Sequence, residues 1–417
     1  MAERTRRTYK AKITNQSQVR DDLDALGFAA SKLWNVARYY AEDRWQEDGV
    51  IPDDAELKAE LKDHERYTDL HSQSSQRVFE ELAEAFTGWY NSDDGNNPPG
   101  YRKHGDQHPR STVSFKEAGF KHDAKHQQVR LSKGRNLKQS RSDFVLCEYE
   151  VRPDVEIENI QQVRAVYEDG RWWLHIVCRH LIDPDSPGDA TAGIDLGICN
   201  YAAVAFEDEV VLVPGNRLKE DKHYFTQQEY DTEGENGPSN AALRARKKLA
   251  RRRTHFLHAL SKHIAGMCEE RGVGRIAVGD LTGVREDDDA DKAENWGRHG
   301  NKRLHGWEFD RFTRLLEYKA AERGIVVDRV PENGTSKTCS VCGTENGDQR
   351  VERGLYVCEE CDTAVNADAN GAENIRQTLT PSPSPDRSNG RLARPATRLF
   401  DQPAGRFSPP DQVSCGP

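Results

Sequence analysis

The N-terminal part of the chain changes from alternating to helical spacing of its apolar residues. Residues 1–14 alternate polar and apolar side chains, which predicts a first strand. Over 17–45 and again over 53–90, apolar side chains return every three or four positions, as on one face of a helix. The sequence Asn97-Pro98-Pro99-Gly100 ends this pattern, because proline and glycine interrupt regular structure. We therefore expect one strand followed by a helical insertion over residues 15–109.

Short alternating runs over residues 110–188 predict a β-rich segment. The clearest is a hairpin, in which Val163–Tyr167 meets Trp172–Val177 across a turn that contains Asp169-Gly170. An Asp-Gly pair between β-prone runs is a strong hairpin signal, because the tight turn needs positive φ at both positions. Two prolines between residues 183 and 188 then mark a domain boundary.

Strands and helices alternate over residues 189–333, which predicts an α/β domain. In chain order we expect strands over 192–206 and 210–213, a helix over 241–272, a strand over 276–278, a helix over 309–323 and a strand over 325–330. The long helix is amphipathic, and its inward side chains are expected to be Leu243, Leu249, Phe256, Leu260 and Ile264.

The last forty residues differ from the rest in composition. Residues 378–417 are rich in Pro, Ser and Arg and poor in apolar side chains. A segment of that kind buries too little apolar surface to offset the entropy of ordering, so we expect a disordered tail. No run of 18 apolar residues and no secretory signal are evident, which predicts a cytoplasmic protein without a membrane span. The oligomeric state leaves no trace in the sequence.

Charge alone leaves the partner open. The net charge is −10 and the pI is about 5.8, which fits an ordinary acidic enzyme without a polyanionic partner. The alternative is the acidic surface of a halophile's protein in which charge is locally segregated, and the run Glu286-Asp287-Asp288-Asp289 and the excess of Arg over Lys favour it. Local charge therefore carries more information than the total.

Seven of the ten residues from 244 to 253 are basic, which is a dense cluster in an acidic chain. A solvated helix face would mix both signs, so this run favours contact with a nucleic-acid backbone. The candidate residues are Arg244, Arg246, Lys247, Lys248, Arg251, Arg252 and Arg253. The aromatic residues Trp34, Tyr39, Tyr40 and Trp45 are open to two interpretations, base stacking and, preferably, core packing.

Four of the nine cysteines form two close pairs. Cys339 and Cys342 are separated by two residues, and Cys358 and Cys361 repeat that spacing fifteen residues later. Four thiolates on two tight knuckles match the closed tetrahedral geometry of a structural Zn²⁺ site. With no open coordination position, such a metal folds its segment and performs no chemistry. A disulfide framework is disfavoured by the odd number of cysteines in a chain without an export signal.

Two aspartates stand where burial makes a carboxylate costly. Asp195 interrupts an apolar strand between two glycines, and Asp368 lies at the start of an Asn-rich helix after the second cysteine pair. Each has an ordinary explanation, because Asp often forms turns at strand ends and caps helices. Together they are candidates for one cation site, although 172 residues separate them.

The order of these features resembles the TnpB family. The resemblance covers Asp195, the apolar run Ile276–Leu281, the four-cysteine ribbon with Thr335–Thr338 before it, and the helix that carries Asp368. It implies an RNase H-like (RuvC) nuclease domain over 189–333 and 365–377, with an inserted zinc ribbon over 334–364. It further implies, before residue 189, a β-rich wedge domain (1–14 and 110–188) that carries a helical recognition domain (15–109).

The resemblance also implies an activity. TnpB proteins are transposon-encoded RNA-guided DNA endonucleases, in which three carboxylates hold two Mg²⁺ ions. The family's first and last aspartates fall on Asp195 and Asp368, so guide RNA, double-stranded DNA, catalytic Mg²⁺ and structural Zn²⁺ are the expected partners and cofactors. A DNA-strand transposase is the weaker alternative, because no tyrosine or serine recombinase site is evident.

One position departs from the family. The middle carboxylate, a Glu directly before Asp-Leu, is replaced by Gly279. Asp280 points to the opposite face of a strand and cannot simply substitute for it. Two alternatives follow: another acid compensates, with residues 286–289 as the nearest candidate, or the chain is an RNA-guided DNA binder that no longer cuts.

Overall fold

The chain divides into two compact units, Met1–Ile182 and Asp183–Pro417. Each is described separately below. The computed structural model describes residues 3–92, 97–102, 110–138, 142–153, 155–182, 184–197, 199–230, 233–234, 237–280, 308–332, 334–347, 351–352, 354–380 and 390–412. The acidic run over 286–289 therefore lies outside the described residues. Among the described helices, none combines the length and the apolar character needed to cross a bilayer.

The first unit is built on a seven-stranded antiparallel sheet in the order β2-β6-β7-β1-β5-β4-β3. Its strands are β1 (Glu3–Ile13), β2 (Val113–Lys116), β3 (Phe120–Asp123), β4 (Gln128–Ser132), β5 (Phe144–Glu150), β6 (Ile160–Glu168) and β7 (Arg171–Ile182). The hairpin predicted from Asp169-Gly170 is confirmed, because Glu168 pairs with Arg171 and both turn residues have positive φ. The N-terminal strand lies between β5 and β7, at the centre of the sheet.

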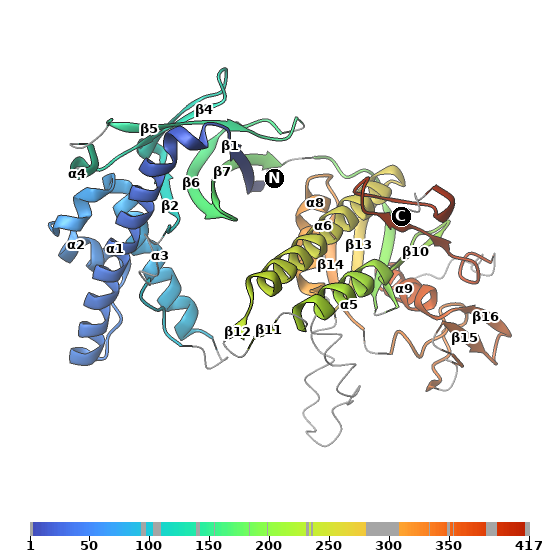
Figure 1. The fold of residues 1–417 in the computed structure, drawn as a ribbon. Coiled ribbons are helices and arrows are strands. Elements are labelled where there is room, and N and C mark those ends of the chain that lie inside the picture. The colour runs from blue at the N-terminus through green and yellow to red at the C-terminus, as the bar shows by residue number, and fades with distance from the viewer. Residues whose placement is uncertain are drawn as a thin grey trace. The chain divides into compact units, whose positions relative to one another are not determined.

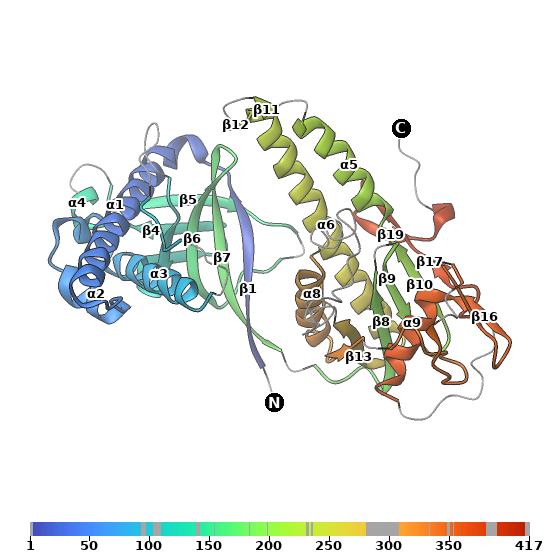
Figure 2. The same ribbon diagram turned by 90° about the horizontal axis from the view of Figure 1, so that it is seen from below.

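Among the described residues between β1 and β2, three α-helices are inserted, of which the first and third contact this sheet and the second packs on the third (Figure 2). They are α1 (Gln16–Asp48), α2 (Asp54–Leu61) and α3 (Ser72–Tyr90), and a short helix α4 (Arg135–Lys138) follows β4. The core contains Leu26, Phe79 and Trp172, all fully buried. Of the four candidate aromatics, Trp34 is packed, with the Arg102 guanidinium 4.0 Å from its ring centre, whereas Tyr39 and Trp45 are exposed.

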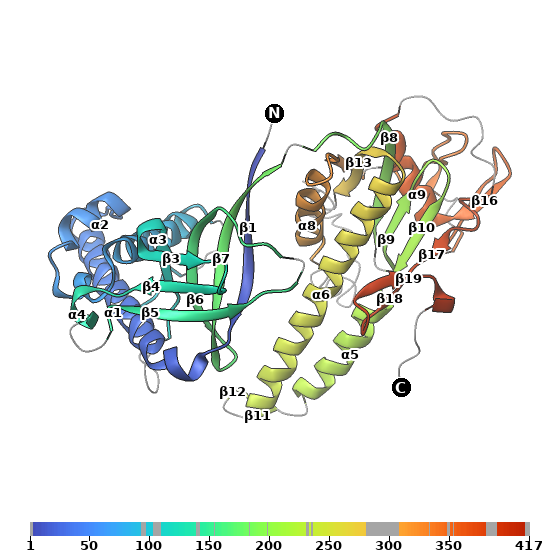
Figure 3. The same ribbon diagram turned by 90° about the horizontal axis from the view of Figure 1, so that it is seen from above.

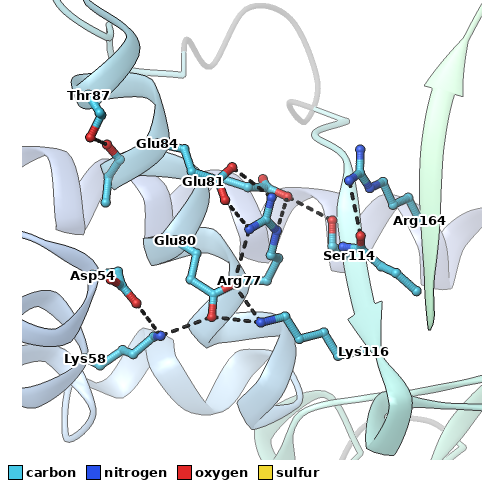
Figure 4. A network of polar contacts seen from close by, with 12 residues as sticks. Asp54, Lys58, Arg77, Glu80, Glu81, Glu84, Thr87, Ser114, Lys116 and Arg164 are labelled. Carbon is cyan, nitrogen blue, oxygen red and sulfur yellow. Dashed lines mark hydrogen bonds and ion pairs between the residues drawn. The ribbon is translucent and has the colours of Figure 1, made fainter. Parts of the chain in front are cut away.

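An ion network joins the helices to the sheet edge (Figure 4). Glu80 on α3 accepts hydrogen bonds from Lys58 of α2 at 3.0 Å, from Lys116 of β2 at 2.7 Å and from Arg77 at 3.2 Å. Burial opposes ionisation of Glu80, but these three cations outweigh it and lower its pKa to about 2. Arg77 also binds Glu84 through two parallel hydrogen bonds, and because both residues belong to α3 this pair stabilises the helix itself.

The second unit contains a six-stranded sheet in the order β14-β13-β8-β9-β10-β17. Its strands are β8 (Ala190–Leu196), β9 (Asn200–Ala205), β10 (Val210–Pro214), β13 (Val273–Asp280), β14 (Val326–Pro331) and β17 (Ala396–Thr397). The first three form an antiparallel meander, and β13 and then β14 add in parallel on the other side of β8. Three antiparallel strands followed outward by two parallel strands is the arrangement of the RNase H-like fold, as expected from the sequence.

Different elements cover the two faces of this sheet (Figures 1 and 2). Helices α6 (Asn240–Glu270) and α8 (Phe309–Ala321) pack against one face, with α5 (Asn216–Tyr230) beside α6. Helix α9 (Ala367–Gln377) and the hairpin of β15 (Leu355–Cys358) and β16 (Thr363–Asn366) cover the other face. A small hairpin of β11 (Glu233–Gly234) and β12 (Gly237–Pro238) precedes α6.

The expected inward face of α6 is right in its second half and wrong at Leu243. Phe256, Leu260 and Ile264 are fully or almost fully buried, but Leu243 is exposed. The apolar face of α6 contains Ala242 and Ala245 at that end instead. A leucine at helical spacing predicts burial only where another layer covers it, and the sequence of the helix does not reveal where its cover ends.

The expectation of a disordered tail is wrong for residues 390–412. Strand β17 pairs in parallel with β10, and β18 (Leu399–Asp401) and β19 (Arg406–Ser408) form a hairpin. Figure 3 labels the two strands β18 and β19 of this hairpin. Phe400 and Phe407 of the hairpin pack edge-on against Phe256 of α6, and Leu392 is buried. Average composition concealed these apolar side chains, which anchor the segment through tertiary contacts that no local pattern records.

Candidate functional site

The site is organised by the close approach of α9 to β8. A Cβ atom on Gly193 of β8 would overlap the carbonyl oxygen of Ala372 and lie 2.7 Å from Cα of Arg376. Only glycine permits two backbones to come so near. Two residues further along the strand and on the same face, the Asp195 carboxylate lies against Gly371, where a Cβ atom would be 2.7 Å from Oδ2. Asp195 is thereby directed at α9.

Asp368 lies on the same helix, three residues before Gly371 and hence on the adjoining turn of one face. Asn366 caps the helix, because its Oδ1 accepts hydrogen bonds from the backbone N–H groups of Asp368 at 3.1 Å and Ala369 at 3.0 Å. This cap leaves the Asp368 carboxylate available to other groups. Its Oδ2 accepts a hydrogen bond of 2.8 Å from Nδ2 of Asn200, on the strand paired with β8. Asp195 and Asp368, which are 173 positions apart in sequence, therefore both lie where α9 approaches β8 and β9.

A third carboxylate, Glu332, arrives at this end from β14. Val278 pairs with Ile194, so the next residues on the two strands, Gly279 and Asp195, lie side by side. Val330 of β14 pairs with Gly279, and Glu332 follows two positions later on the same face. A Cβ atom on Gly279 would overlap Oε1 of Glu332 and lie 2.7 Å from its Cγ and Cδ. The Glu332 side chain therefore fills the space that a side chain at 279 would enter.

The surroundings of Glu332 are unfavourable for its charge. Burial, reinforced by the negative charges of Asp195 and Asp280, raises the pKa of Glu332 to about 8. Its Oε1 is shielded from solvent and has no hydrogen-bond partner among the described residues. The sequence reasoning missed this residue, because a Glu after a strand looks like an ordinary loop residue. The available signal was Gly279, because a glycine within an apolar strand indicates that another side chain fills the space beside it.

These carboxylates fit a hard divalent cation. Asp195, Glu332 and Asp368 offer oxygen ligands, which Mg²⁺ prefers, and the buried Glu332 oxygen is a donor atom in want of a positive partner. Among the described residues, only the four cysteines bring three or more candidate ligand atoms within 4.8 Å of one another. The carboxylates would thus have to draw together around a cation, as expected of like charges that repel each other without one.

The four cysteines converge at the ribbon. Sγ of Cys339 lies 3.7 Å from that of Cys361, and Sγ of Cys342 lies 3.5 Å from that of Cys358. Tetrahedral zinc with bonds of about 2.3 Å requires sulfur atoms ~3.8 Å apart, so the thiolates are already near that geometry. The turn after the first pair uses Gly343 with a φ of +80°, which glycine adopts without strain. The arrangement fits zinc and leaves no open position for chemistry.

The ribbon is fastened to α9 by asparagine side chains. Asn370, fully buried, accepts a hydrogen bond of 2.9 Å from the N–H of Ser340 and donates one of 2.8 Å to the carbonyl of Thr338. Asn374 donates to the carbonyls of Thr335 and Thr338, each at 2.7 Å. The first cysteine knuckle and the helix that carries Asp368 are therefore one structural piece. The sequence showed these asparagines as part of a motif but did not show what they bind.

The basic run on α6 divides into two groups. Arg252 pairs with Asp221 of α5, and Arg253 lies 3.3 Å from Glu308, so both belong to local ion pairs. The other five, Arg244, Arg246, Lys247, Lys248 and Arg251, are exposed. Arg244, Lys247, Lys248 and Arg251 share one face by their spacing of three, four and seven. We call these four residues the basic stripe.

A buried ion cluster connects α9 to the C-terminal segment. Arg376 donates two hydrogen bonds of 2.9 Å to Glu373, and Arg391 lies 3.4 Å from the same carboxylate. Burial disfavours the charge on Glu373, but the two guanidinium groups more than offset this and lower its pKa. Arg376 also donates a hydrogen bond of 3.2 Å to Oγ1 of Thr191 on β8. The cluster thereby fixes the C-terminal end of α9 to the start of β8.

Two protein families match parts of the chain, mostly within this unit. The family described as Cas12f1-like, TNB domain, matches residues 309–375, and the family described as Probable transposase matches residues 154–285. The CRISPR-associated endodeoxyribonuclease Cas12f1 of Sulfoacidibacillus thermotolerans is 32% identical over 130 residues, which are 31% of this chain and 28% of that protein.

Two further relatives cover more of the chain. The TnpB-like protein ORF457 of Acidianus two-tailed virus is 26% identical over 413 residues, 89% of this chain and 86% of that protein. The "Putative RNA-guided DNA endonuclease InsQ" of Escherichia coli (strain K12) is 25% identical over 229 residues, 52% of this chain and 56% of that protein. The chain thus spans between 28% and 86% of the length of these three relatives.

The strands β8, β9, β10 and β13 and the four-cysteine ribbon lie within the residues that match these two family descriptions. Together with the TnpB-like and RNA-guided endonuclease relatives, these matches support the resemblance to the TnpB family that the sequence indicated.

Proposed function

We propose that this protein is a Mg²⁺-dependent DNA endonuclease of a transposable element, guided by RNA. The observation that carries the proposal is the convergence of Asp195 and Asp368, from β8 and α9, at one end of the RNase H-like sheet. The names of the relatives, an endodeoxyribonuclease and an RNA-guided DNA endonuclease, support the reaction class and the guide. Guide RNA and double-stranded target DNA are the partners.

Each residue of the site has a stated task in this proposal. Asp195 and Asp368 hold the cations, and the amide of Asn200 keeps the Asp368 carboxylate turned toward the start of β9. Bound Mg²⁺ ions supply positive charge to the attacking and leaving oxygens of a phosphodiester. The hydrogen bonds between Asn370 of α9 and the ribbon hold α9 in place, and with it Asp368. Zn²⁺ on Cys339, Cys342, Cys358 and Cys361 would stabilise that assembly without entering the reaction.

Nucleic acid would bind through positive charge. The basic stripe presents four cations on a helix that has no acidic residue between 240 and 268. Phosphate contacts of this kind give affinity without sequence information, so the guide would supply the specificity. We further propose that the sheet of the first unit, with β1 at its centre, is the wedge domain, and that α1 to α3 form the recognition domain.

The proposal is tested by purification, RNA sequencing and cleavage. RNA that copurifies with the chain identifies the guide, and a plasmid with the matching target is then incubated with the complex and Mg²⁺. We expect linear product from the native chain and a loss of more than about 100-fold with Asp195→Asn or Asp368→Asn. Asp328→Asn, which removes a carboxylate from β14 away from the proposed site, serves as the control, and this variant should cut normally.

The cleavage-deficient binder remains the second candidate, and Gly279 is the observation that favours it. It predicts that the native complex binds its target with the affinity of the two Asp variants and gives no product. Target binding and cleavage measured on the same preparation therefore separate the two functions.

A further inference from the structure

We propose that Glu332 supplies the third metal-binding carboxylate of this site, in place of the side chain that Gly279 lacks. The inference rests on the proposed nuclease function and concerns which of the chain's residues completes its cation site. The family pattern places this carboxylate on β13, whereas here it comes from the end of the neighbouring strand β14.

The strand register carries the argument. Asp195, Gly279 and Val330 lie in one row across β8, β13 and β14, and Glu332 is the next residue on the same face of β14. Its carboxylate reaches back into the row, because a Cβ atom on Gly279 would overlap Oε1 and touch Cδ at 2.7 Å. Any side chain at 279 larger than hydrogen would displace it. The glycine and the glutamate are therefore two halves of one arrangement.

Glu332 is also placed as a ligand rather than as a structural carboxylate. Oε1 is shielded from solvent, and no described N–H, O–H or cation approaches it. Buried carboxylates that serve the fold are paired, as Glu373 is with Arg376 and Arg391. A buried carboxylate oxygen that faces Asp195 without a partner needs a cation, and the bound metal would supply it.

Asp280 does not fulfil this role. It follows Gly279 directly and so belongs to the opposite face of β13. That face carries Ile276 and Val278, which belong to the hydrophobic core beneath α6 and α8. Residues 286–289 lie outside the described residues and are not needed, because the row already contains a carboxylate. The chain thus has a complete set of three: Asp195, Glu332 and Asp368.

Metal binding tests the inference independently of cleavage. Mn²⁺ is the probe, because it favours the same oxygen ligands as Mg²⁺, does not compete with Zn²⁺ for thiolates, and loses its sharp electron paramagnetic resonance signal when bound. The zinc-loaded full chain is titrated with Mn²⁺. We expect Glu332→Gln to weaken Mn²⁺ binding by more than about tenfold, as Asp195→Asn does, and Asp328→Asn to leave it unchanged.

A relocated carboxylate provides the matched control for folding. Glu332→Ala combined with Gly279→Glu clears the space beside β13 and places the acid there, so Mn²⁺ binding should return to within a few-fold of the native value. Gly279→Glu alone has to displace Glu332 and should give no gain. Restoration by the pair together with loss in Glu332→Gln establishes the assignment, because a merely structural glutamate would not be replaced by an acid on another strand.

The outcomes separate this inference from the function on which it rests. If Glu332→Gln binds Mn²⁺ like the native chain, or if the native chain binds no Mn²⁺, Glu332 is not a ligand, whatever the cleavage assay shows. If Mn²⁺ binding depends on Glu332 but the native complex never cuts its target, the metal site stands and the endonuclease function fails.

Discussion

Gly193 and Ala372 bring a strand and a helix together more closely than any side chain would allow. A Cβ atom on Gly193 would overlap the carbonyl oxygen of Ala372, and this contact sets how deeply α9 sits on β8. The same approach places Asp195 against Gly371 and hence beside the turn that carries Asp368. The geometry of the carboxylates therefore depends on a residue that has no side chain.

Gly193→Ala is expected to push α9 away from the sheet. Overpacking of this kind costs about 1–3 kcal/mol of unfolding free energy, and the shift should also weaken Mn²⁺ binding, although no ligand is changed. Denaturant unfolding and the Mn²⁺ titration measure the two effects. Gly266→Ala on α6 is the matched control: nothing lies within 4 Å of its Cβ position, so it should be neutral or stabilise the protein by about 0.5–1 kcal/mol. Native Mn²⁺ affinity in Gly193→Ala would show that the close approach does not position the site.

Zinc should hold the carboxylate helix as well as the ribbon. Removal of the metal, by a chelator or by Cys358→Ser, is expected to loosen the first knuckle and release the contacts of Ser340 and Thr338 with Asn370. Amide hydrogen exchange should then quicken over α9 as well as over residues 334–366, with less than one zinc per chain by elemental analysis. Cys199→Ser, an exposed cysteine outside the cluster, should keep its zinc and its protection. Faster exchange confined to the ribbon would mean that α9 is held by the sheet alone.

How far the sequence predicts this site depends on whether a residue acts within a local motif. The cysteine pairs and the two aspartates stand in short motifs; the structure brings the four cysteines together and places Asp195 against Gly371 on the helix that carries Asp368. Glu332 belongs to no motif, because it lies 53 residues after Gly279 in sequence and comes beside it only through the pairing of β13 with β14. Periodicity likewise predicted the helix and its buried half but misplaced Leu243, since cover by a second layer is a tertiary property.

The alternation of strands and helices predicted the α/β class, and the Asp169-Gly170 turn predicted its hairpin. The tail shows the opposite case. Few apolar side chains, above all Phe400 and Phe407, fix residues that composition alone assigns to disorder. Arg391 adds a buried charge to the same anchor, and its partner Glu373 lies on a different element. Such contacts cannot be read from a segment in isolation, because each partner looks ordinary by itself.

The basic stripe should bind a measurable number of phosphates. Replacement of Arg244, Lys247, Lys248 and Arg251 by Gln is expected to lower RNA affinity and to reduce the slope of log K against log salt by ~0.7 for each single-strand phosphate that is no longer neutralised. Fluorescence anisotropy at several salt concentrations gives the slope. Lys262→Gln, an exposed cation further along α6, is the control and should change neither quantity. An unchanged slope in the fourfold variant would mean that the basic stripe faces solvent and does not contact RNA phosphates. By contrast, Arg252→Gln should act on stability, because Arg252 pairs with the buried Asp221.

Acid should weaken the anchor of the C-terminal hairpin through His263. The ring of His263 stacks on Phe407 with centroids 5.4 Å apart, and burial, aided by the charges of Arg398 and Arg271, lowers its pKa to about 4. The unfolded chain would have a pKa near 6.5. Because the folded value is the lower one, this stabilisation is fully present above pH 6.5 and is lost as the pH falls toward 4.

Replacement of His263 isolates this contribution. His263→Phe keeps an aromatic ring against Phe407 but cannot take up a proton. Between pH 6.5 and 4 the native chain should therefore lose about 1–2 kcal/mol more unfolding free energy than this variant. Urea unfolding at a series of pH values measures the difference, and His255→Phe, which changes the exposed histidine beside Phe400, should follow the native curve. Parallel curves for the native chain and His263→Phe would mean that the hairpin stays in place when the ring is charged, and that other groups govern its response to acid.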